Sequence, residues 1–286
     1  MKKIKLYIIT YKRNDILSET IDYILQSDFM NVCEGEIFVI SNHTSTKLKE
    51  EHINKVTIIR NEGRPDWSNG NLSESWNQAV VHGFKDLSNP NCDYVVGFQN
   101  DAICDKNWCS NLLKLHQNFD YVQGRYGDNI ISFSPEHIKK VGIYDERFCG
   151  IQYHFADYLI RSIQNNKDRT YVDDIMHRIT YNNNPSLTLD IPGNRNITDD
   201  LKRRPDDGEQ SGIWQSSRVG IYPRHAWNYF TWKWGGTHSK GLSRETWTQN
   251  WSEDFKNNIP TGQKKEFVRY PYFEKDINKK IYEIGW

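Results

Sequence analysis

The chain has 286 residues, with 37 basic and 37 acidic side chains, so its formal net charge is zero. That balance argues against a nucleic-acid-binding protein that works through bulk electrostatic attraction. The basic N-terminus precedes only a short apolar run, which predicts a first strand rather than a signal peptide, and no uncharged apolar segment is long enough to span a bilayer. Five cysteines without a CxxC pair indicate free thiols in a reducing compartment, so we expect a cytoplasmic protein.

Short apolar runs alternate with apolar residues at helical spacing over the first part of the chain. The runs predict strands at residues 5–9, 36–40, 55–59, 93–98, 130–133 and 169–175. The helical spacing predicts helices that begin near residues 14, 72, 105, 135 and 155. Strands that alternate with helices and join through short polar turns indicate an α/β fold with a mostly parallel sheet flanked by helices.

Polar residues follow the predicted strands. Gln99, Asn100 and Asp101 come directly after the apolar run at residues 94–98. An apolar core would not accept these polar side chains without hydrogen-bond partners. In open α/β sheets, ligands bind outside the carboxyl ends of the strands. A carboxylate at that edge suits a divalent cation that carries phosphate oxygens, while a plain turn with a capping acid remains the structural alternative.

The composition divides the chain into three parts. Residues 1–181 carry the alternating pattern and are predicted to form the catalytic core. Residues 182–212 are rich in Asn, Pro, Gly, Asp and Arg without periodicity, which predicts a flexible loop or lid. Residues 213–286 are rich in Trp and Tyr and are expected to form a C-terminal extension of the same domain on the acceptor side.

Five stretches resemble the nucleotide-sugar-dependent glycosyltransferases of the GT-A fold, in particular the family-2-like group. They are Ile-Thr-Tyr-Lys-Arg at 9–13, Ser-Glu-Ser-Trp-Asn-Gln-Ala at 73–79, Phe-Gln-Asn-Asp at 98–101, Gly-Ile-Tyr-Asp-Glu-Arg-Phe at 142–148 and, more weakly, residues 229–236 with Lys-Trp-Gly-Gly. No single motif is specific, but the five occur in the family's order. The resemblance implies a Rossmann-like GT-A fold with an aromatic-rich C-terminal extension.

The resemblance also implies an activity and a site. The expected reaction moves a sugar from a nucleoside-diphosphate sugar, with UDP-sugar favoured, to a hydroxyl of a glycan or glycoconjugate, with inversion at the anomeric centre. It would depend on Mn²⁺ or Mg²⁺ held by Asp101, with His238 as a further ligand, and Trp234 and Gly235 would contact the acceptor. The residues expected to contact the donor are Thr10, Tyr11, Arg13, Ser41, Asn42, Arg64, Asn77 and Asn100.

Two positions depart from the family's pattern. Ser41 stands where an acid usually helps to bind the nucleobase, and Phe155 stands where an Asp usually deprotonates the acceptor hydroxyl. Asp157 and His154 are the titratable side chains left in that stretch, so we expect Asp157 to act as the base, with His154 orienting or replacing it. The structural alternative is that Asp157 only pairs with Arg161, one helical turn later.

The missing acid leaves a second function open. The fold could serve as a catalytically inactive module that binds a carbohydrate or a nucleotide sugar. A nucleotidyltransferase is a third possibility, because those enzymes share the sheet, but the sequence has no Gly-rich, basic phosphate-binding loop after the first strand.

Overall fold

The computed structural model describes residues 1–11, 13–61, 72–124, 130–148, 153–174, 179–180, 193–194, 229–230 and 233. Four of the residues expected in the site lie outside this part of the chain: Arg64, Trp234, Gly235 and His238. Most of the expected loop at residues 182–212 and most of the C-terminal extension also lie outside it. The described part of the chain is thus the core together with residues 179–180, 193–194, 229–230 and 233.

In the described residues, one eight-stranded sheet has the order β3-β2-β1-β4-β7-β6-β8-β9. The strands β3, β2, β1 and β4 are parallel to their neighbours, as are β6 and β8, whereas β7 runs antiparallel to both β4 and β6. The strand bounds are β1 Lys2–Thr10, β2 Cys33–Ser41, β3 Thr57–Arg60, β4 Tyr94–Gln99, β6 Tyr121–Gln123, β7 Ile130–Phe133, β8 Thr170–Asp174 and β9 Ile179–Thr180. The predicted α/β class with a mostly parallel sheet is confirmed.

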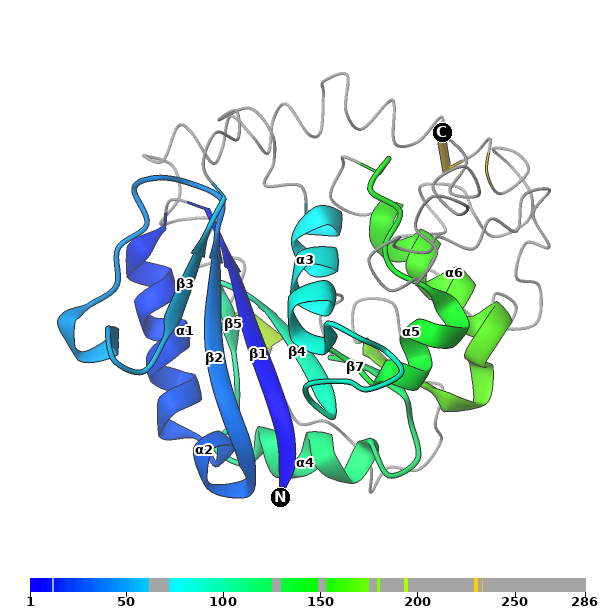
Figure 1. Cartoon of the computed structure of the whole chain (residues 1–286), viewed down its shortest axis with the longest axis horizontal. Helices are drawn as coiled ribbons and strands as arrows, with labels where there is room; N and C mark the ends of the chain where they lie inside the picture. The colour runs from blue at the N-terminus through cyan, green and yellow to red at the C-terminus, as the bar shows by residue number, and fades with distance from the viewer. Residues whose placement is uncertain are drawn as a thin grey trace.

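Helices cover both faces of the sheet (Figure 1). One face carries α1 (Asn14–Gln26), α2 (Phe29–Val32) and α4 (Trp108–Leu115), and the other carries α3 (Leu72–Phe84), α5 (Pro135–Val141) and α6 (Tyr153–Asn166). Two 3₁₀ turns, η1 (Glu50–His52) and η3 (Lys167–Arg169), lie in connections. Strand β1 is buried on both sides, because Leu6 and Ile8 pack in one apolar cluster and Tyr7 and Ile9 in the other.

Two glycines let α3 lie close to β4. A Cβ atom on Gly97 would come within 2.3 Å of the Trp76 ring, and a Cβ atom on Gly83 would come equally close to Val95, at 2.3 Å. Trp76 is fully buried and cannot move away. The close approach fixes the height of α3 on the sheet and thereby the position of the polar residues on its first two turns.

Three local expectations differ from the structure. Helix α4 begins at Trp108 rather than near Asp105, and the amides of Cys109 and Ser110 donate to the carboxylate of Asp28, about eighty residues earlier in the chain. The three-residue strand β6 was not predicted, because so short a run carries no periodicity. The reversed direction of β7 was not predicted either, since sequence pattern does not encode strand direction.

One strand pair connects the core to the segment expected to be a loop. Strand β5 (Ala102–Ile103) pairs antiparallel with β10 (Gly193–Asn194). The partner of Asn194 is Ala102, the residue directly after Asp101. At least these two residues of the 182–212 segment therefore lie beside the end of β4.

The described cysteines are Cys33, Cys92, Cys104 and Cys109, and all four are buried and free, as the sequence predicted. Burial raises the pKa of the Cys104 thiol to about 12, which keeps it protonated. Among the described helices, none combines the length and the apolar character needed to cross a membrane.

Two histidines are buried as neutral rings. His116 donates through Nδ1 to Phe119 O at 3.0 Å, and its Nε2 accepts from Ser132 Oγ at 2.7 Å. Its ring stacks on Tyr94 with 3.9 Å between centroids. His137 contacts Ser162 Oγ at 3.3 Å and Asn166 Nδ2 at 3.2 Å. Burial lowers the pKa of His116 to about 4 and that of His137 to about 3.

The two buried histidines predict that the protein loses stability on acidification at pH values above those at which carboxylates titrate. Because both folded pKa values lie below the unfolded value of about 6.5, the unfolded chain binds more protons as the pH falls, and stability is lost from pH 6.5 downward. Between pH 6.5 and 5 we expect the free energy of unfolding to fall by roughly 3 kcal/mol for the two together. Urea unfolding across this range measures it. A flat profile, or equal slopes for His137→Gln and a His43→Gln control, contradicts the assignment.

Candidate active site

The register of the sheet brings the ends of its parallel strands into line. Thr10 is paired with Ser41, and Ser41 is paired with Arg60 on the next strand. On the other side of β1, Ile9 is paired with Gln99 at the end of β4. The polar residues that follow β1, β2, β3 and β4 therefore share one edge, as the sequence indicated.

The turn after β4 is held by side chains from two other elements. Asn100 donates its side-chain amide to Thr10 Oγ1 at 3.3 Å, at the end of β1. Thr20, buried in α1, donates its hydroxyl to Asn100 O at 2.6 Å and lies 3.2 Å from Ala102 O. The main chain is thus tied down on both sides of Asp101, whose side chain is half-buried. Asp101 has a fixed position at the edge where a ligand of this fold class would bind.

The chemistry of this turn fits a hard divalent cation. Asp101 offers a carboxylate and Asn100 an amide oxygen, and oxygen atoms of these kinds are the ligands that Mg²⁺ and Mn²⁺ prefer. A cation that keeps several waters or substrate oxygens needs only one or two protein carboxylates. The residues present are therefore compatible with the expected metal.

A second group of possible ligands already holds a cation of its own. Asp22, Glu51 and His52 bring three ligand atoms together within 4.8 Å. The Lys49 ammonium lies 2.8 Å from Asp22 Oδ2 and 3.6 Å from Glu51, and His52 Nε2 lies 2.7 Å from Asp22 Oδ1. Bonds from Lys49 and His52 outweigh the effect of burial and hold the pKa of Asp22 below its usual value. We interpret this group as an ion-pair network.

Tyr11 and Arg13 follow β1. Tyr11 is half-buried and meets the His43 ring edge-on, with 5.4 Å between centroids. Arg13 is half-buried and donates through Nε at 3.0 Å and through Nη2 at 2.9 Å to the two oxygens of Asp15, which is exposed. The structure places Tyr11 and His43 together at the same edge as Asp101, and their contact with a nucleotide stays a prediction.

Ser41 and Asn42 are buried at the end of β2. Ser41 donates its hydroxyl to His43 O at 2.8 Å. Asn42 donates to Ser75 Oγ at 3.0 Å and accepts from Asn61 Nδ2 at 2.9 Å. These bonds connect the end of β2 to the first turn of α3. The expected contact of Ser41 and Asn42 with the donor stays a prediction, and their described bonds are structural.

Asn77 acts as a clamp between α3 and the segment at residues 142–148. Its amide nitrogen donates to Tyr144 O at 2.9 Å and to Glu146 Oε1 at 2.8 Å, and its oxygen accepts from Tyr144 N at 2.8 Å. The side chain is buried. Two motifs of the resemblance, 73–79 and 142–148, are therefore in direct contact through Asn77, whereas its expected role in binding the donor stays a prediction.

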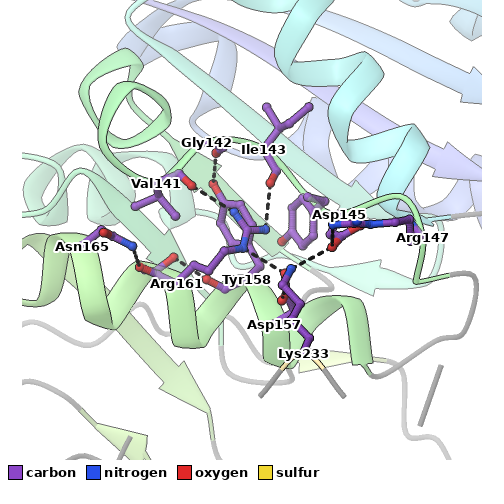
Figure 2. Close-up of polar contacts among 12 residues, drawn as sticks. Val141, Gly142, Ile143, Asp145, Arg147, Asp157, Tyr158, Arg161, Asn165 and Lys233 are labelled. Atoms are coloured by element: carbon purple, nitrogen blue, oxygen red, sulfur yellow. Dashed lines mark hydrogen bonds and ion pairs between the residues drawn. The ribbon is translucent and has the colours of Figure 1, made fainter. Parts of the chain in front are cut away.

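The same segment contributes to a cluster of five charged residues, drawn in Figure 2, of which four are buried and Arg147 is half-buried. Asp145 accepts from Arg147 Nε at 2.8 Å and from Lys233 Nζ at 2.7 Å. Asp157 accepts from Arg161 Nε at 2.9 Å and from Lys233 Nζ, again at 2.7 Å. We call Asp145, Arg147, Asp157, Arg161 and Lys233 the charged cluster. Lys233 is the member that contacts both carboxylates.

Burial and pairing in the charged cluster fix the state of Asp145. Burial alone would raise the pKa of this carboxyl, but the bonds from Arg147 and Lys233 outweigh it and hold the pKa well below its usual range. Asp145 is therefore ionised at neutral pH. Tyr229 donates its hydroxyl at 3.0 Å to Asp145 Oδ2, the oxygen that also accepts from Lys233. Both Tyr229 and Lys233 therefore contact Asp145.

The two residues expected to supply the base lie on the first turns of α6. His154 is buried, and its ring lies 5.7 Å from that of Tyr144. Asp157 is also buried, and its two oxygens accept separately from Lys233 and Arg161. The pairing of Asp157 with Arg161 is the structural alternative that the sequence left open. The assignment of Asp157 and His154 as the base stays a prediction.

Comparison with known proteins finds similar solved structures but no sequence relative. No protein-family model and no curated protein matches the chain. The mannosyltransferase PcManGT from Pyrobaculum calidifontis, solved with GDP-Man and Mn²⁺, is similar at 12% identity and TM-score 0.43, over 61% of this chain and 55% of that one. Residues 1–349 of S. aureus TarS, solved with UDP, are similar at 12% identity and TM-score 0.43, over 59% and 57% of the two chains. The chain spans little more than half the length of these proteins.

Sequence reasoning missed Lys233 and Thr20. Lys233 stands in the Lys-Trp-Gly-Gly stretch, where the aromatic and glycine residues attracted attention, and a lysine in a polar sequence is usually exposed. Thr20 falls on the buried side of α1 together with Leu17 and Ile21, and a polar residue on an apolar helix face is the pattern that identifies it.

The Asn77 clamp predicts a large loss of stability on truncation. Asn77→Ala leaves a buried amide and a buried carbonyl of Tyr144 without their partner, which we expect to cost roughly 2–4 kcal/mol. Gln78→Ala is the matched control, because Gln78 is half-buried and exchanges bonds only with the half-buried Asn61 among the described partners. Urea unfolding compares them. Equal, small losses in both variants would show that the clamp does not carry stability.

Proposed function

We propose that the chain is a metal-dependent glycosyltransferase of the GT-A fold. It transfers a sugar from a nucleoside-diphosphate sugar, with UDP-sugar favoured, to a hydroxyl of a glycan or glycoconjugate, with inversion. The observation that carries the proposal is the restrained turn that holds Asp101 and Asn100 beside Thr10 at the carboxyl edge of the parallel strands. The order of the sequence motifs supports it, as does the contact between two of them through Asn77.

The proposed metal would be Mn²⁺ or Mg²⁺, held by Asp101 with help from Asn100. When bound, such a cation stabilises the negative charge that develops on the leaving diphosphate. Thr10, Tyr11 and Arg13 surround the position where the base and ribose of the donor would lie. Arg13 pairs with the exposed Asp15, and a bound donor would take the place of that carboxylate. His238 is proposed as a further ligand from outside the described residues.

We propose that the base is Asp157 or His154, and the two residues differ in their contacts. Asp157 accepts from two cations, so as the base it would exchange one of these contacts for the acceptor hydroxyl during the reaction. His154 lies one helical turn away on the same element, and an imidazole is well suited to accept a proton near neutral pH. Asp157 is proposed first because it is the remaining carboxylate in the stretch that resembles the family's catalytic motif.

One observation favours a second function. The only acid left in the family's catalytic stretch of α6, Asp157, is buried and paired, and Phe155 replaces the usual base. A binding module that holds a nucleotide sugar without turning it over would show the same features. Turnover of a donor distinguishes the two functions.

The remaining parts of the proposal concern the acceptor and the compartment. Trp234 and Gly235, which follow the buried Lys233, are proposed to contact the acceptor. The free state of the described cysteines supports a reducing compartment, and we propose the cytoplasm.

The metal assignment predicts a specific loss of binding. Asp101→Asn removes the carboxylate and keeps the side-chain size, so we expect Mn²⁺-dependent affinity for UDP or GDP to fall by at least ~10-fold, since an ionic ligand is lost. Calorimetry with and without Mn²⁺ measures it. Thr20→Val is the companion variant: it removes the hydroxyl that holds the turn and should give a smaller loss, which Thr20→Ser restores. Unchanged Mn²⁺-dependent affinity in Asp101→Asn would refute the site.

The base assignment predicts a loss of rate without a loss of donor binding. A positioned base contributes ~10²–10⁴-fold, so transfer should fall by that factor in Asp157→Asn, in His154→Ala or in both. The transfer rate is measured against pH, with nucleotide affinity and the unfolding midpoint as controls, because Asp157→Asn also disturbs two ion pairs. Near-native rates in both variants would show that the base lies elsewhere.

A further inference from the structure

Lys233 is buried in the core, and the described residues that it contacts, Asp145, Phe148 and Asp157, lie far from it along the chain. Its side chain is 0% exposed, and its ammonium lies 2.7 Å from Asp145 and 2.7 Å from Asp157. The same ammonium lies 5.5 Å from the centre of the Phe148 ring. Burial of an ammonium is costly unless each of its protons finds an acceptor, so this position is well defined.

Each of the two carboxylates also has a cation within its own element. Asp145 pairs with Arg147, two residues later in the same segment, and Asp157 pairs with Arg161, one turn later on α6. Local partners therefore already compensate both charges. Among the described cations, Lys233 is the one that joins the two pairs, so its specific effect is to connect the elements rather than to neutralise an otherwise unpaired acid.

The connected elements are those that carry the candidate catalytic residues. The segment at residues 142–148 is clamped to α3 by Asn77, and Arg161 donates to Val141 O at 3.0 Å and to Ile143 O at 2.8 Å. Figure 2 shows Lys233 between Asp145 on this segment and Asp157 on α6. The packing of Phe230 in the apolar core places a second anchor next to Lys233 in sequence.

We propose that Lys233 is a positioning residue for the transfer reaction. By bridging Asp145 and Asp157, it holds the first turns of α6, with His154, in a fixed relation to the 142–148 segment and hence to α3. This inference rests on the proposed function. It goes beyond that function because it assigns a role to a residue that acts through the carboxylates of Asp145 and Asp157 rather than by binding the donor or the metal.

The test is kinetic. Lys233→Met removes the ammonium and keeps most of the volume. We expect kcat for donor turnover to fall by ~10-fold or more while Mn²⁺-dependent nucleotide affinity stays within about twofold, because Asp101 and the strand ends are unaffected. Lys140→Met is the matched control, since Lys140 is a half-exposed lysine that pairs with Asp120 at 3.4 Å, and it should leave both quantities unchanged.

A double variant guards against failure of the single one to fold. Lys233→Met combined with Asp145→Asn removes one charge of each sign and should show the same loss of kcat. A native kcat in either folded variant overturns the inference. A fall in kcat that is matched by an equal fall in nucleotide affinity also overturns it, because it would indicate general destabilisation.

Failure of the proposed function is recognised separately. If the wild-type protein turns over no donor, that function is wrong, and hydrogen exchange then decides the inference. If Lys233 holds the two elements together, Lys233→Met should increase the exchange of amides in residues 142–148 and in the first turns of α6, while the amides of β1 and β2 stay unchanged. Unchanged exchange in residues 142–148 and α6 would overturn the inference.

Discussion

The interaction on which the second half of the fold depends is the burial of two carboxylates with enough cations to compensate them. Asp145 and Asp157 lie on different elements, and neither is accessible to water, so their charges must be met inside the protein. Arg147, two residues after Asp145, and Arg161, one helical turn after Asp157, provide a local partner for each carboxylate, and Lys233 connects the two. An interior of this kind has little freedom to rearrange, because any shift of α6 against the 142–148 segment breaks a charged contact.

The first half of the fold depends on sheet register instead. Parallel pairing of β3, β2, β1 and β4 aligns the ends of the strands, and the residues that follow them are therefore neighbours whatever their distance in sequence. The Asn100 and Thr20 bonds then set the turn that carries Asp101. Two different physical devices, strand register and buried ion pairs, thus organise the two sides of the candidate site, and the Asn77 clamp joins them.

The parts of the fold that follow from local pattern could be predicted from the sequence. The periodic helix α3 and the apolar strand β4 are examples, since burial alone dictates their residue pattern. The helix start at Trp108 was misplaced because its amides are satisfied by Asp28 from a distant element, and β7 has a direction that no periodicity records. For the site, the polar edge with Asp101 was predictable from the strand ends. Lys233 was not, because its burial depends on two acids that are 88 and 76 residues earlier in the numbering of the chain.

The position of Lys233 in the chain has a consequence for synthesis. A ribosome makes Asp145 and Asp157 several seconds before residue 233, at the usual rate of ~5–20 residues per second. During that interval α3, the 142–148 segment and α6 can make contact through Asn77 and Arg161. The contacts of Asp145 and Asp157 with Lys233 cannot yet form. Until residue 233 is made, the two carboxylates on this side of the site lack the lysine that connects them.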